Sequence, residues 1–453
     1  MKILIAGDGK VGATLTRQLS AEGYDITLID SDQEVLERSM EQYDVMTVYG
    51  NCASMDVLKT ADVGEAQLLI AVTSADEVNL LSCLTAHALN PRIHTIARIR
   101  NPEYTGQAYS MREAFALSLS INPDRQAAVE IERLIKYPGF LKRSSFAKGR
   151  VEIVELRVTE KSALCGLALS SFYKVLSCKV LVCAVLRDGR AIAPDGNFVL
   201  QPADKIFVTA SADSLTTLLK NLNIITHKAK RVMLAGGGRV SYYLAQDLSR
   251  AGYSVQLIEQ SEERCRQLAS LLPDTCIVHG DASDQTLLDS EGLSDCDVFV
   301  SLTGLDELNM ILSLCAQSSG VPHVITKIGR FTTSKILDSL PLGSVVSPRE
   351  LSCSTIVRYV RAMQNKEGAA LTIHSIAEGQ AEAIEFLVDR NTRHCGEPLK
   401  VLNVRKNVLV CCIIRGIQTI IPDGDSFLKE RDTVIIVATN EIVIRQLNDI
   451  FEE

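Results

Sequence analysis

Short apolar runs alternate with segments of helical periodicity along the first quarter of the chain. Strand-length apolar runs are expected near residues 2–6, 25–29, 45–48, 68–72 and 93–98. Apolar residues recur at helical spacing between them, over residues 11–22, 34–41 and 77–89. Because alternating strands and helices build βαβ units, the pattern predicts a parallel sheet with helices on both faces.

An amphipathic helix is predicted directly after this region. It begins at Pro123, and its apolar positions are Ala127, Ala128, Ile131, Leu134 and Ile135. The run Tyr137-Pro138-Gly139 is expected to end it, since proline and glycine interrupt helices. A counterpart follows Pro348, with apolar residues at Ile356, Val357, Val360 and Met363. Such a stripe either packs on its own domain or docks on another subunit, and periodicity alone leaves both alternatives open.

Short alternating strands replace this pattern from about Val151. Turn signals follow at Asp188-Gly189 and at Pro194-Asp195-Gly196. These features predict a small α+β domain. The second half of the chain repeats the change from about Glu382.

Landmarks of the first half recur in the same order in the second half. The pairs are Gly7 with Gly236, Asp30 with Glu259, Tyr49-Gly50-Asn51 with His279-Gly280-Asp281, Thr73 with Thr303, Arg98 with Lys327, and Asp204 with Asp432. This order indicates a tandem duplication. The predicted fold class is therefore α/β, with two tandem Rossmann-like parallel-sheet domains, each followed by a small α+β domain. The expected boundaries are 1–122, 143–227, 230–347 and 368–453 for the four domains, with linker helices at 123–142 and 348–367.

A glycine motif, Gly7-Asp8-Gly9-Lys10-Val11-Gly12, lies between the first predicted strand and helix. In this motif the first glycine permits a tight turn, the second lets a pyrophosphate approach the backbone, and the third lets the helix pack close. The free N–H groups at the helix start favour phosphate. Asp30 ends the second predicted strand, where a carboxylate binds ribose hydroxyls and repels a 2′-phosphate. The motif therefore predicts NAD rather than NADP.

The second copy reads Gly236-Gly237-Gly238-Arg239-Val240-Ser241, with Glu259 in place of Asp30. Ser241 replaces the third glycine, and its small size is expected to preserve the helix packing. Arg239 takes the place of Lys10, and either reaches a phosphate or points to solvent. We therefore expect the second site to bind either NAD, like the first site, or a different nucleotide, with ATP or ADP as the alternative.

Composition adds limits to this picture. Hydrophobic residues make up 46% of the chain and charged residues 23%, as in globular proteins, and the net charge of −8 argues against a broad nucleic-acid interface. No apolar run reaches the length of a membrane span, and Met1–Ala6 is too short for a signal-peptide core. The 13 cysteines lack zinc spacing and paired CxxC clusters, so we expect reduced core residues in an intracellular protein.

Catalytic signals are missing from the sequence. The seven histidines form no motif, and no GxSxG, HExxH or Walker A pattern occurs. Asp76-Glu77 and Asp306-Glu307 are expected to cap the helices that begin there. These observations predict neither a catalytic nor a metal site, and they favour a nucleotide-binding regulator over the alternative, an NAD-dependent dehydrogenase with a duplicated cofactor domain.

The whole chain resembles the RCK (KTN) regulatory proteins of potassium transport. The resemblance is carried by Gly7 to Gly12, Tyr49-Gly50-Asn51, Ala71 to Asn79 and Ile96 to Ile99. It implies the order RCK-N, RCK-C, RCK-N, RCK-C. It also implies a homo-oligomeric, tetrameric ring on the cytoplasmic face of the inner membrane, bound to a membrane-embedded Trk-type potassium channel subunit. Nucleotide binding would gate potassium flux, and an RCK regulator of another ion channel or of an antiporter remains an alternative.

The resemblance also implies which residues contact the dinucleotide. In the first copy these are Gly7, Asp8, Gly9, Lys10, Val11, Gly12, Asp30, Thr73, Ser74 and Arg98. In the second copy they are Gly236, Gly237, Gly238, Arg239, Val240, Ser241, Glu259, Thr303, Gly304 and Lys327. Ser241 and Lys327 depart from the first copy.

Overall fold

The computed structural model describes most of the chain. The described residues are 1–110, 112–136, 142–147, 150–160, 162–172, 178–222, 229–329, 340–364, 370–377, 380–439, 442, 444 and 446–452. The predicted helix end at Tyr137-Pro138-Gly139 lies outside them, as do the last residues of both predicted linker segments.

The first sheet is parallel and has the strand order β3-β2-β1-β4-β5-β6. Its strands are β1 (Lys2–Ala6), β2 (Asp25–Asp30), β3 (Met46–Tyr49), β4 (Leu68–Ala71), β5 (His94–Arg98) and β6 (Leu119–Ile121). Its helices are α1 (Lys10–Ala21), α2 (Gln33–Gln42), α3 (Met55–Thr60), α4 (Asp76–Leu89) and α5 (Pro102–Ser110). The predicted strands and helices are confirmed to within one residue at each boundary.

The second sheet repeats this topology, with the order β14-β13-β12-β15-β16-β17. Its strands are β12 (Arg231–Ala235), β13 (Ser254–Glu259), β14 (Thr275–His279), β15 (Val298–Ser301), β16 (His323–Lys327) and β17 (Ser344–Val346). Its helices are α9 (Arg239–Arg250), α10 (Glu262–Leu271), α11 (Gln285–Ser290), α12 (Asp306–Ser318) and the 3-10 turn Leu293–Asp295. In each sheet the strand order reverses beside the first strand, and ligands of open α/β sheets bind at that point.

Two antiparallel sheets follow the Rossmann-like domains in sequence. The first, β10-β9-β11-β8-β7, contains β7 (Lys142–Phe146), β8 (Val151–Arg157), β9 (Leu181–Arg187), β10 (Arg190–Ile192) and β11 (Lys205–Ser211). The second, β18-β19-β22-β20-β21, contains β18 (Ala370–Ile376), β19 (Ala381–Leu387), β20 (Val408–Arg415), β21 (Gln418–Ile420) and β22 (Thr433–Thr439). Helix α8 (Ala212–Asn221) and short 3-10 turns at Leu169–Ser171, Leu399–Val401 and Leu447–Ile450 complete them. Each antiparallel sheet has one strand, β7 or β18, that precedes the residue at which the sequence pattern predicted the change to short strands, Val151 or Glu382.

The chain folds into two compact units, and each unit contains one type of domain from both copies. One compact unit holds both parallel sheets, and the other holds both antiparallel sheets. In the second unit a single core cluster contains Phe146 and Phe207 of the first copy together with Ile376 and Ile435 of the second. The two copies are therefore folded into each other, which two independent tandem domains would not require.

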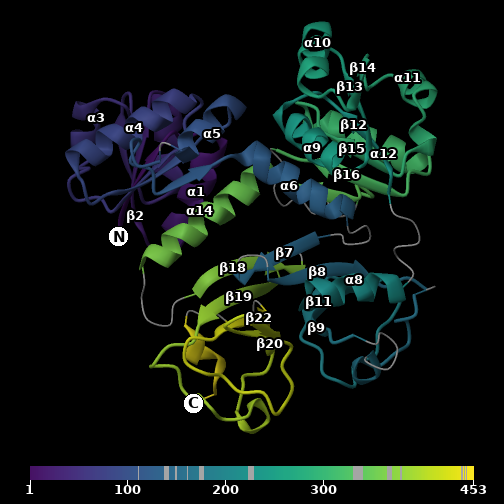
Figure 1. The fold of residues 1–453 in the computed structure, drawn as a ribbon. Helices are drawn as coiled ribbons and strands as arrows, with labels where there is room; N and C mark the ends of the chain where they lie inside the picture. Colours follow the sequence, from purple (N-terminus) through teal and green to yellow (C-terminus); the bar gives the residue numbers. More distant parts are fainter. Residues whose placement is uncertain are drawn as a thin grey trace. The chain divides into compact units, whose positions relative to one another are not determined.

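The linker helices join the two Rossmann-like domains. Helix α6 (Pro123–Lys136) follows the first copy, and its Arg125 forms an ion pair with Asp247 of α9 in the second copy. Helix α14 (Pro348–Gln364) follows the second copy and lies beside α1 (Figure 1). The Cys353 Sγ of α14 is 3.8 Å from the Val11 carbonyl oxygen of α1. Each helix thus packs on the other copy within one chain, an arrangement that neither sequence-based alternative included.

A buried ion pair recurs in the two antiparallel sheets. Arg187 Nη2 lies 2.7 Å from Asp204 Oδ2, and Arg415 Nη2 lies 2.7 Å from Asp432 Oδ2. Burial raises the pKa of Asp204, but the hydrogen bonds from Arg187 and from the Gln201 backbone outweigh it, so that this pKa lies below its usual value. The repeated aspartates Asp204 and Asp432 are therefore structural.

Candidate functional site

The first glycine loop joins β1 to α1 at the carboxyl end of the first sheet. Gly7 has a φ of +94°, and a Cβ there would lie 2.8 Å from the Thr73 backbone nitrogen. A Cβ at Gly12 would lie 1.9 Å from the Gly7 carbonyl oxygen. Because backbone occupies both positions, a side chain at either glycine would force the loop and the helix apart.

Gly9 is under no such steric constraint. No atom lies within 4 Å of the position of its Cβ, and its φ of −71° suits any residue. Gly9 is the N-cap of α1, and the first N–H groups of a helix lack partners inside the helix. A phosphate that approached those N–H groups would occupy the space that a side chain at Gly9 would fill. The loop therefore fits a pyrophosphate.

Asp30 lies at this loop, at the last position of β2. Its Oδ2 accepts a hydrogen bond of 2.6 Å from the Asp8 backbone N–H, and its Oδ1 accepts one of 3.0 Å from the Asp32 N–H. These bonds fix the carboxylate beside the loop, where a ribose would reach it.

Asp8 differs from Asp30 because its side chain is only 3% exposed. The Ser39 hydroxyl donates a hydrogen bond of 2.5 Å to Asp8 Oδ2. Burial raises the pKa of Asp8, the Ser39 hydrogen bond opposes this effect, and the nearby Asp30 charge adds to it. The sequence assigned Asp8 to the loop but did not indicate that it is buried.

Asn79 organises the loop that follows β4, and sequence reasoning missed this role. Asn79 Oδ1 accepts hydrogen bonds from the Thr73 N–H at 2.8 Å and from the Thr73 hydroxyl at 2.7 Å. Asn79 Nδ2 donates to the Arg98 carbonyl oxygen at 2.9 Å. Asn309 makes the equivalent bonds in the second copy, to Thr303 and to Lys327. Its repetition in the Asp-Glu-x-Asn motif was a signal that could have identified it.

Arg98 ends β5 at the same edge of the sheet. Its Nη2 donates to the Thr73 carbonyl oxygen at 2.5 Å, while its Nε is buried without a hydrogen-bond partner among the described residues. Burial lowers the pKa of Arg98 to about 10, and the neighbouring Arg100 charge acts in the same direction. Arg100 was not predicted, and its Nη2 donates to the Ser74 carbonyl oxygen at 2.5 Å. Two cations therefore lie at the loops that face the glycine turn.

The second glycine loop keeps the same backbone course with a different set of side chains. Gly236 has a φ of +104°, and the space at the Gly238 Cβ position is open as at Gly9. The Ser241 hydroxyl donates to the Gly236 carbonyl oxygen, so the residue that replaces the third glycine bonds the loop, and α9 still begins at Arg239. The expectation that serine preserves the helix packing is confirmed.

Glu259 holds the second loop as Asp30 holds the first. Its Oε2 accepts a hydrogen bond of 2.7 Å from the Gly237 N–H, and its Oε1 accepts one of 2.8 Å from the Ser261 N–H. A Cβ at Gly237 would lie 2.7 Å from Leu268 Cδ1. Leu268 occupies the position that corresponds to Ser39, and Gly237 corresponds to the buried Asp8. An apolar contact in the second loop therefore replaces the hydrogen bond between Ser39 and the Asp8 carboxylate.

The structure brings the remaining predicted residues to their own loops. A Cβ at Gly236 would lie 3.0 Å from the Thr303 nitrogen, and Gly304 follows in the same loop. Lys327 Nζ donates to the Leu302 carbonyl oxygen at 3.3 Å, and burial lowers the pKa of Lys327. Lys10 is exposed at the start of α1, whereas Val11 and Val240 are buried.

Arg239 is 47% exposed at the start of α9, and both alternatives for it, a phosphate contact or solvent, stay predictions. Its Nη1 lies 3.8 Å from Asp124 Oδ2, on helix α6 of the first copy. Sequence reasoning missed Asp124, because no local pattern indicates that the linker helix reaches the second loop.

The prediction that Asp76 caps its own helix is wrong. The N-cap of α4 is Ala75, and Asp76 Oδ2 accepts hydrogen bonds from the N–H groups of Arg100 at 2.8 Å and Asn101 at 2.7 Å. Asp306 Oδ1 similarly accepts from the Gly329 N–H at 2.9 Å. These carboxylates tie the start of α4 and α12 to the loop that follows the next strand.

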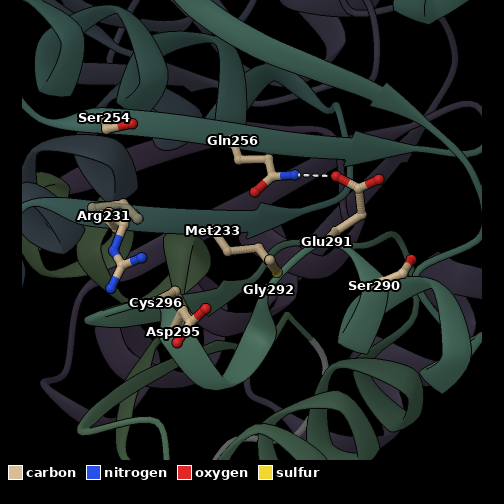
Figure 2. Close-up of a pocket in the computed structure, with 10 residues that line it drawn as sticks. Arg231, Met233, Ser254, Gln256, Ser290, Glu291, Gly292, Asp295 and Cys296 are labelled. Atoms are coloured by element: carbon tan, nitrogen blue, oxygen red, sulfur yellow. Dashed lines mark hydrogen bonds between the residues drawn. The ribbon is translucent and has the colours of Figure 1, made fainter.

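A separate cavity of about 350 Å³ lies at the amino ends of β12 and β13, at the opposite end of the sheet from the glycine loop (Figure 2). Gln256 Nε2 donates to Glu291 Oε2 at 2.5 Å across it. None of the predicted site residues lines it.

Two further features are missing from the part of the chain that the structure describes. No group of three or more histidine, cysteine or acidic side chains there could hold a metal ion. None of the helices there combines the length and apolar composition needed to cross a membrane.

Comparisons with known proteins agree with this geometry. A family model described as the TrkA-N domain matches residues 3–118 and 232–348, and one described as the TrkA-C domain matches residues 153–223. A Trk system potassium uptake protein TrkA of Haemophilus influenzae is 31% identical over 460 residues, which cover 100% of this chain and 99% of that protein.

Solved structures share the fold at low sequence identity. The GsuK channel bound to NAD matches with a TM-score of 0.60 and 18% identity, over 97% of this chain and 77% of that chain. The structure of GsuK bound to ADP matches with a TM-score of 0.52 and 16% identity, over 80% of this chain and 69% of that chain.

Proposed function

Since this chain belongs to the TrkA family, we propose that it is the peripheral regulatory subunit of a Trk-type potassium-uptake system and gates a membrane-embedded channel subunit by binding nucleotides. It is a regulatory protein of this family and not an enzyme, so the dehydrogenase alternative is set aside. The proposal locates it on the cytoplasmic face of the inner membrane, where the channel subunit would hold it.

The open space at Gly9 and Gly238 is the observation that carries the nucleotide assignment. At each position a side chain would be tolerated by the protein itself, yet both copies have glycine beside the first N–H groups of a helix. A bound pyrophosphate accounts for that choice, because its oxygens need the space. Asp30 and Glu259 would then bond the ribose hydroxyls, which favours NAD over NADP.

The structural relatives bound to NAD and to ADP support the two ligand classes proposed from the sequence. NAD, as NAD⁺ or NADH, is proposed for these loops, with ATP or ADP at one of them. Thr73, Ser74 and Arg98, and their counterparts Thr303, Gly304 and Lys327, would contact the phosphates from the facing loops.

Homo-oligomeric assembly is supported by matching apolar positions on the outer helices. Leu81 of α4 is 51% exposed and Leu84 is 40% exposed, while Ile311, at the place in α12 that corresponds to Leu81, is 58% exposed. Apolar groups that recur on the outer face of both copies favour burial against another chain. We propose that these helices pair subunits in a tetrameric ring.

Regulation would follow from different nucleotide affinities in two conformations of the ring. A nucleotide shifts the equilibrium only by the ratio of its affinities for the two states. Because α6 and α14 each contact the other copy, closure of one loop on a ligand would be transmitted to both Rossmann-like domains.

Potassium flux tests the proposal. The chain would be co-purified with a Trk-type membrane subunit, reconstituted in vesicles, and assayed with NAD⁺, NADH, ATP and ADP. We expect at least two of these nucleotides to change the flux in opposite directions or to different extents, and Gly9→Asp with Gly238→Asp to remove the response. Flux that no nucleotide changes would contradict the proposal.

A further inference from the structure

Asp124 lies at the second glycine loop although it belongs to the first copy. It is the second residue of α6, and its Oδ2 lies 3.8 Å from Arg239 Nη1. Arg239 is the first residue of α9 and directly follows Gly238, the N-cap. A carboxylate of the first copy therefore lies beside the guanidinium of the residue that follows the second glycine loop.

Cations from both copies act on the Asp124 carboxylate. Burial raises the pKa of Asp124, and four positive charges oppose that shift. In order of effect they belong to Arg239, Arg100, Lys327 and Arg98. Arg98 and Lys327 occupy the last positions of β5 and β16, so the carboxylate lies where the cations of the two candidate sites meet.

Contacts on either side of Asp124 fix its position. Asn122 Nδ2 donates to the Tyr243 hydroxyl at 3.1 Å. Arg125 pairs with Asp247 and lies over the Tyr243 ring, 5.6 Å from its centroid. Because both contacts hold the start of α6 on α9, a phosphate at the second loop would meet a negative charge that cannot swing away freely.

The linker helix that contacts α1 has the opposite charge at its second position. Pro348 opens α14 as Pro123 opens α6, and the next residue is Arg349 instead of an aspartate. Cys353, one turn further along α14, has its Sγ 3.8 Å from the Val11 carbonyl oxygen of α1. Residues one turn apart lie on the same helix face, so α14 presents a cation on its face toward the first loop.

We propose that Asp124 is a specificity-determining residue of the second nucleotide site, where its charge limits the phosphate charge that the site accepts. The proposal rests on the nucleotide-binding function proposed above. Coulomb repulsion grows with the charge of the ligand, so ATP, with about four negative charges, is disfavoured more than NAD, with about two on its pyrophosphate. Asp124 is therefore assigned the role of lowering the ATP-to-NAD affinity ratio of the second site.

Equilibrium titration of the full chain tests this assignment. Gly9→Asp blocks the first loop, so that only the second is measured. In that background we expect Asp124→Asn to raise the affinity for ATP about tenfold and the affinity for NAD by less than about threefold, because one negative charge near the phosphates is removed. Asp124→Glu keeps the charge and is expected to retain the ATP-to-NAD affinity ratio of the parent.

Two matched variants separate charge from packing. Asp247→Glu keeps the ion-pair partner of Arg125 and so the position of α6 while it changes the packing there, and Glu350→Gln removes an acidic residue from the first turn of the other linker helix. We expect both to leave the affinity ratio unchanged. An unchanged ratio in Asp124→Asn, or an equal change in Asp247→Glu, would overturn the proposal.

Absence of binding is also informative. Binding by the natural chain with none by Gly9→Asp would overturn the assignment, because the second loop would then take no nucleotide. Absence of binding by the natural chain would instead overturn the proposed function itself.

Discussion

The two glycine loops share one backbone and differ in chemistry. In both, a glycine with positive φ turns the chain, an acidic side chain at the end of the second strand accepts a loop N–H, and a buried asparagine ties the facing loop. The side chains around this frame change: Asp8 is buried against Ser39 in the first loop, whereas Gly237 packs against Leu268 in the second. The duplication therefore preserved the hydrogen bonds that shape the loop, while the charges around it diverged.

The antiparallel sheets provide the contrast, because their ion pair did not diverge. Asp204→Asn and Asp432→Asn each remove the buried carboxylate that pairs with a partly exposed arginine. We expect each to lower the free energy of unfolding of this unit by about 1.5–3 kcal/mol, the usual contribution of hydrogen bonds to charged groups. Denaturant unfolding of the two variants should give similar losses; losses that differ by more than about 1 kcal/mol would show that the two pairs are not equivalent.

The Asp204 pair also predicts a pH dependence. Its folded-state pKa lies below the ordinary value of 3.8, so its contribution is present at neutral pH and is lost as the pH falls below 3.8 and through the folded-state pKa. The stability difference between the natural chain and Asp204→Asn should therefore shrink in acid. A difference that stays constant down to strongly acidic pH would contradict this.

Substitutions at the third position of the glycine motif, Gly12 in the first copy and Ser241 in the second, should lower the free energy of unfolding by unequal amounts. Gly12→Ala places a Cβ against the Gly7 carbonyl oxygen, and we expect a loss of about 1–3 kcal/mol from overpacking. Ser241→Ala keeps a Cβ that α9 already accommodates and removes one hydrogen bond, for a loss of about 1 kcal/mol. Thermal unfolding of the pair measures this, and a larger loss for Ser241→Ala would reverse the interpretation.

The smallest effect is expected at Asp8. Its raised pKa means that ionisation opposes folding once the pH exceeds 3.8, the ordinary value. Asp8→Asn should therefore make the nucleotide-free chain slightly more stable at neutral pH and have no such benefit well below pH 3.8. Denaturant unfolding of the natural chain and of Asp8→Asn across this pH range measures the difference in stability. A variant that is less stable than the natural chain at neutral pH would contradict the prediction.

Much of the fold could be predicted from sequence because its signals are local. The strand and helix periods and the glycine motif are set by neighbouring residues, and the repeat doubled the evidence for each. The placement of Asp30 and Glu259 beside the loops followed from strand ends meeting at one edge of a parallel sheet.

Contacts made over long sequence distances could not be predicted in this way. The reach of Asp124 to Arg239 and of Cys353 to Val11 depends on linker helices that cross to the other copy, and helical periodicity gives a buried face without naming what covers it. The burial of Asp8 was likewise hidden, because Ser39 is distant in sequence and only the folded sheet brings the two together.

Counting nucleotide sites is the most direct test of the central claim, that both loops bind a nucleotide. Calorimetric titration of the full chain with NAD and with ATP should together account for two sites per chain, and Gly9→Asp and Gly238→Asp should each remove one of them while leaving the melting temperature nearly unchanged, because both positions open into free space. Two sites that survive in both variants, or no saturable binding by the natural chain, would contradict the account.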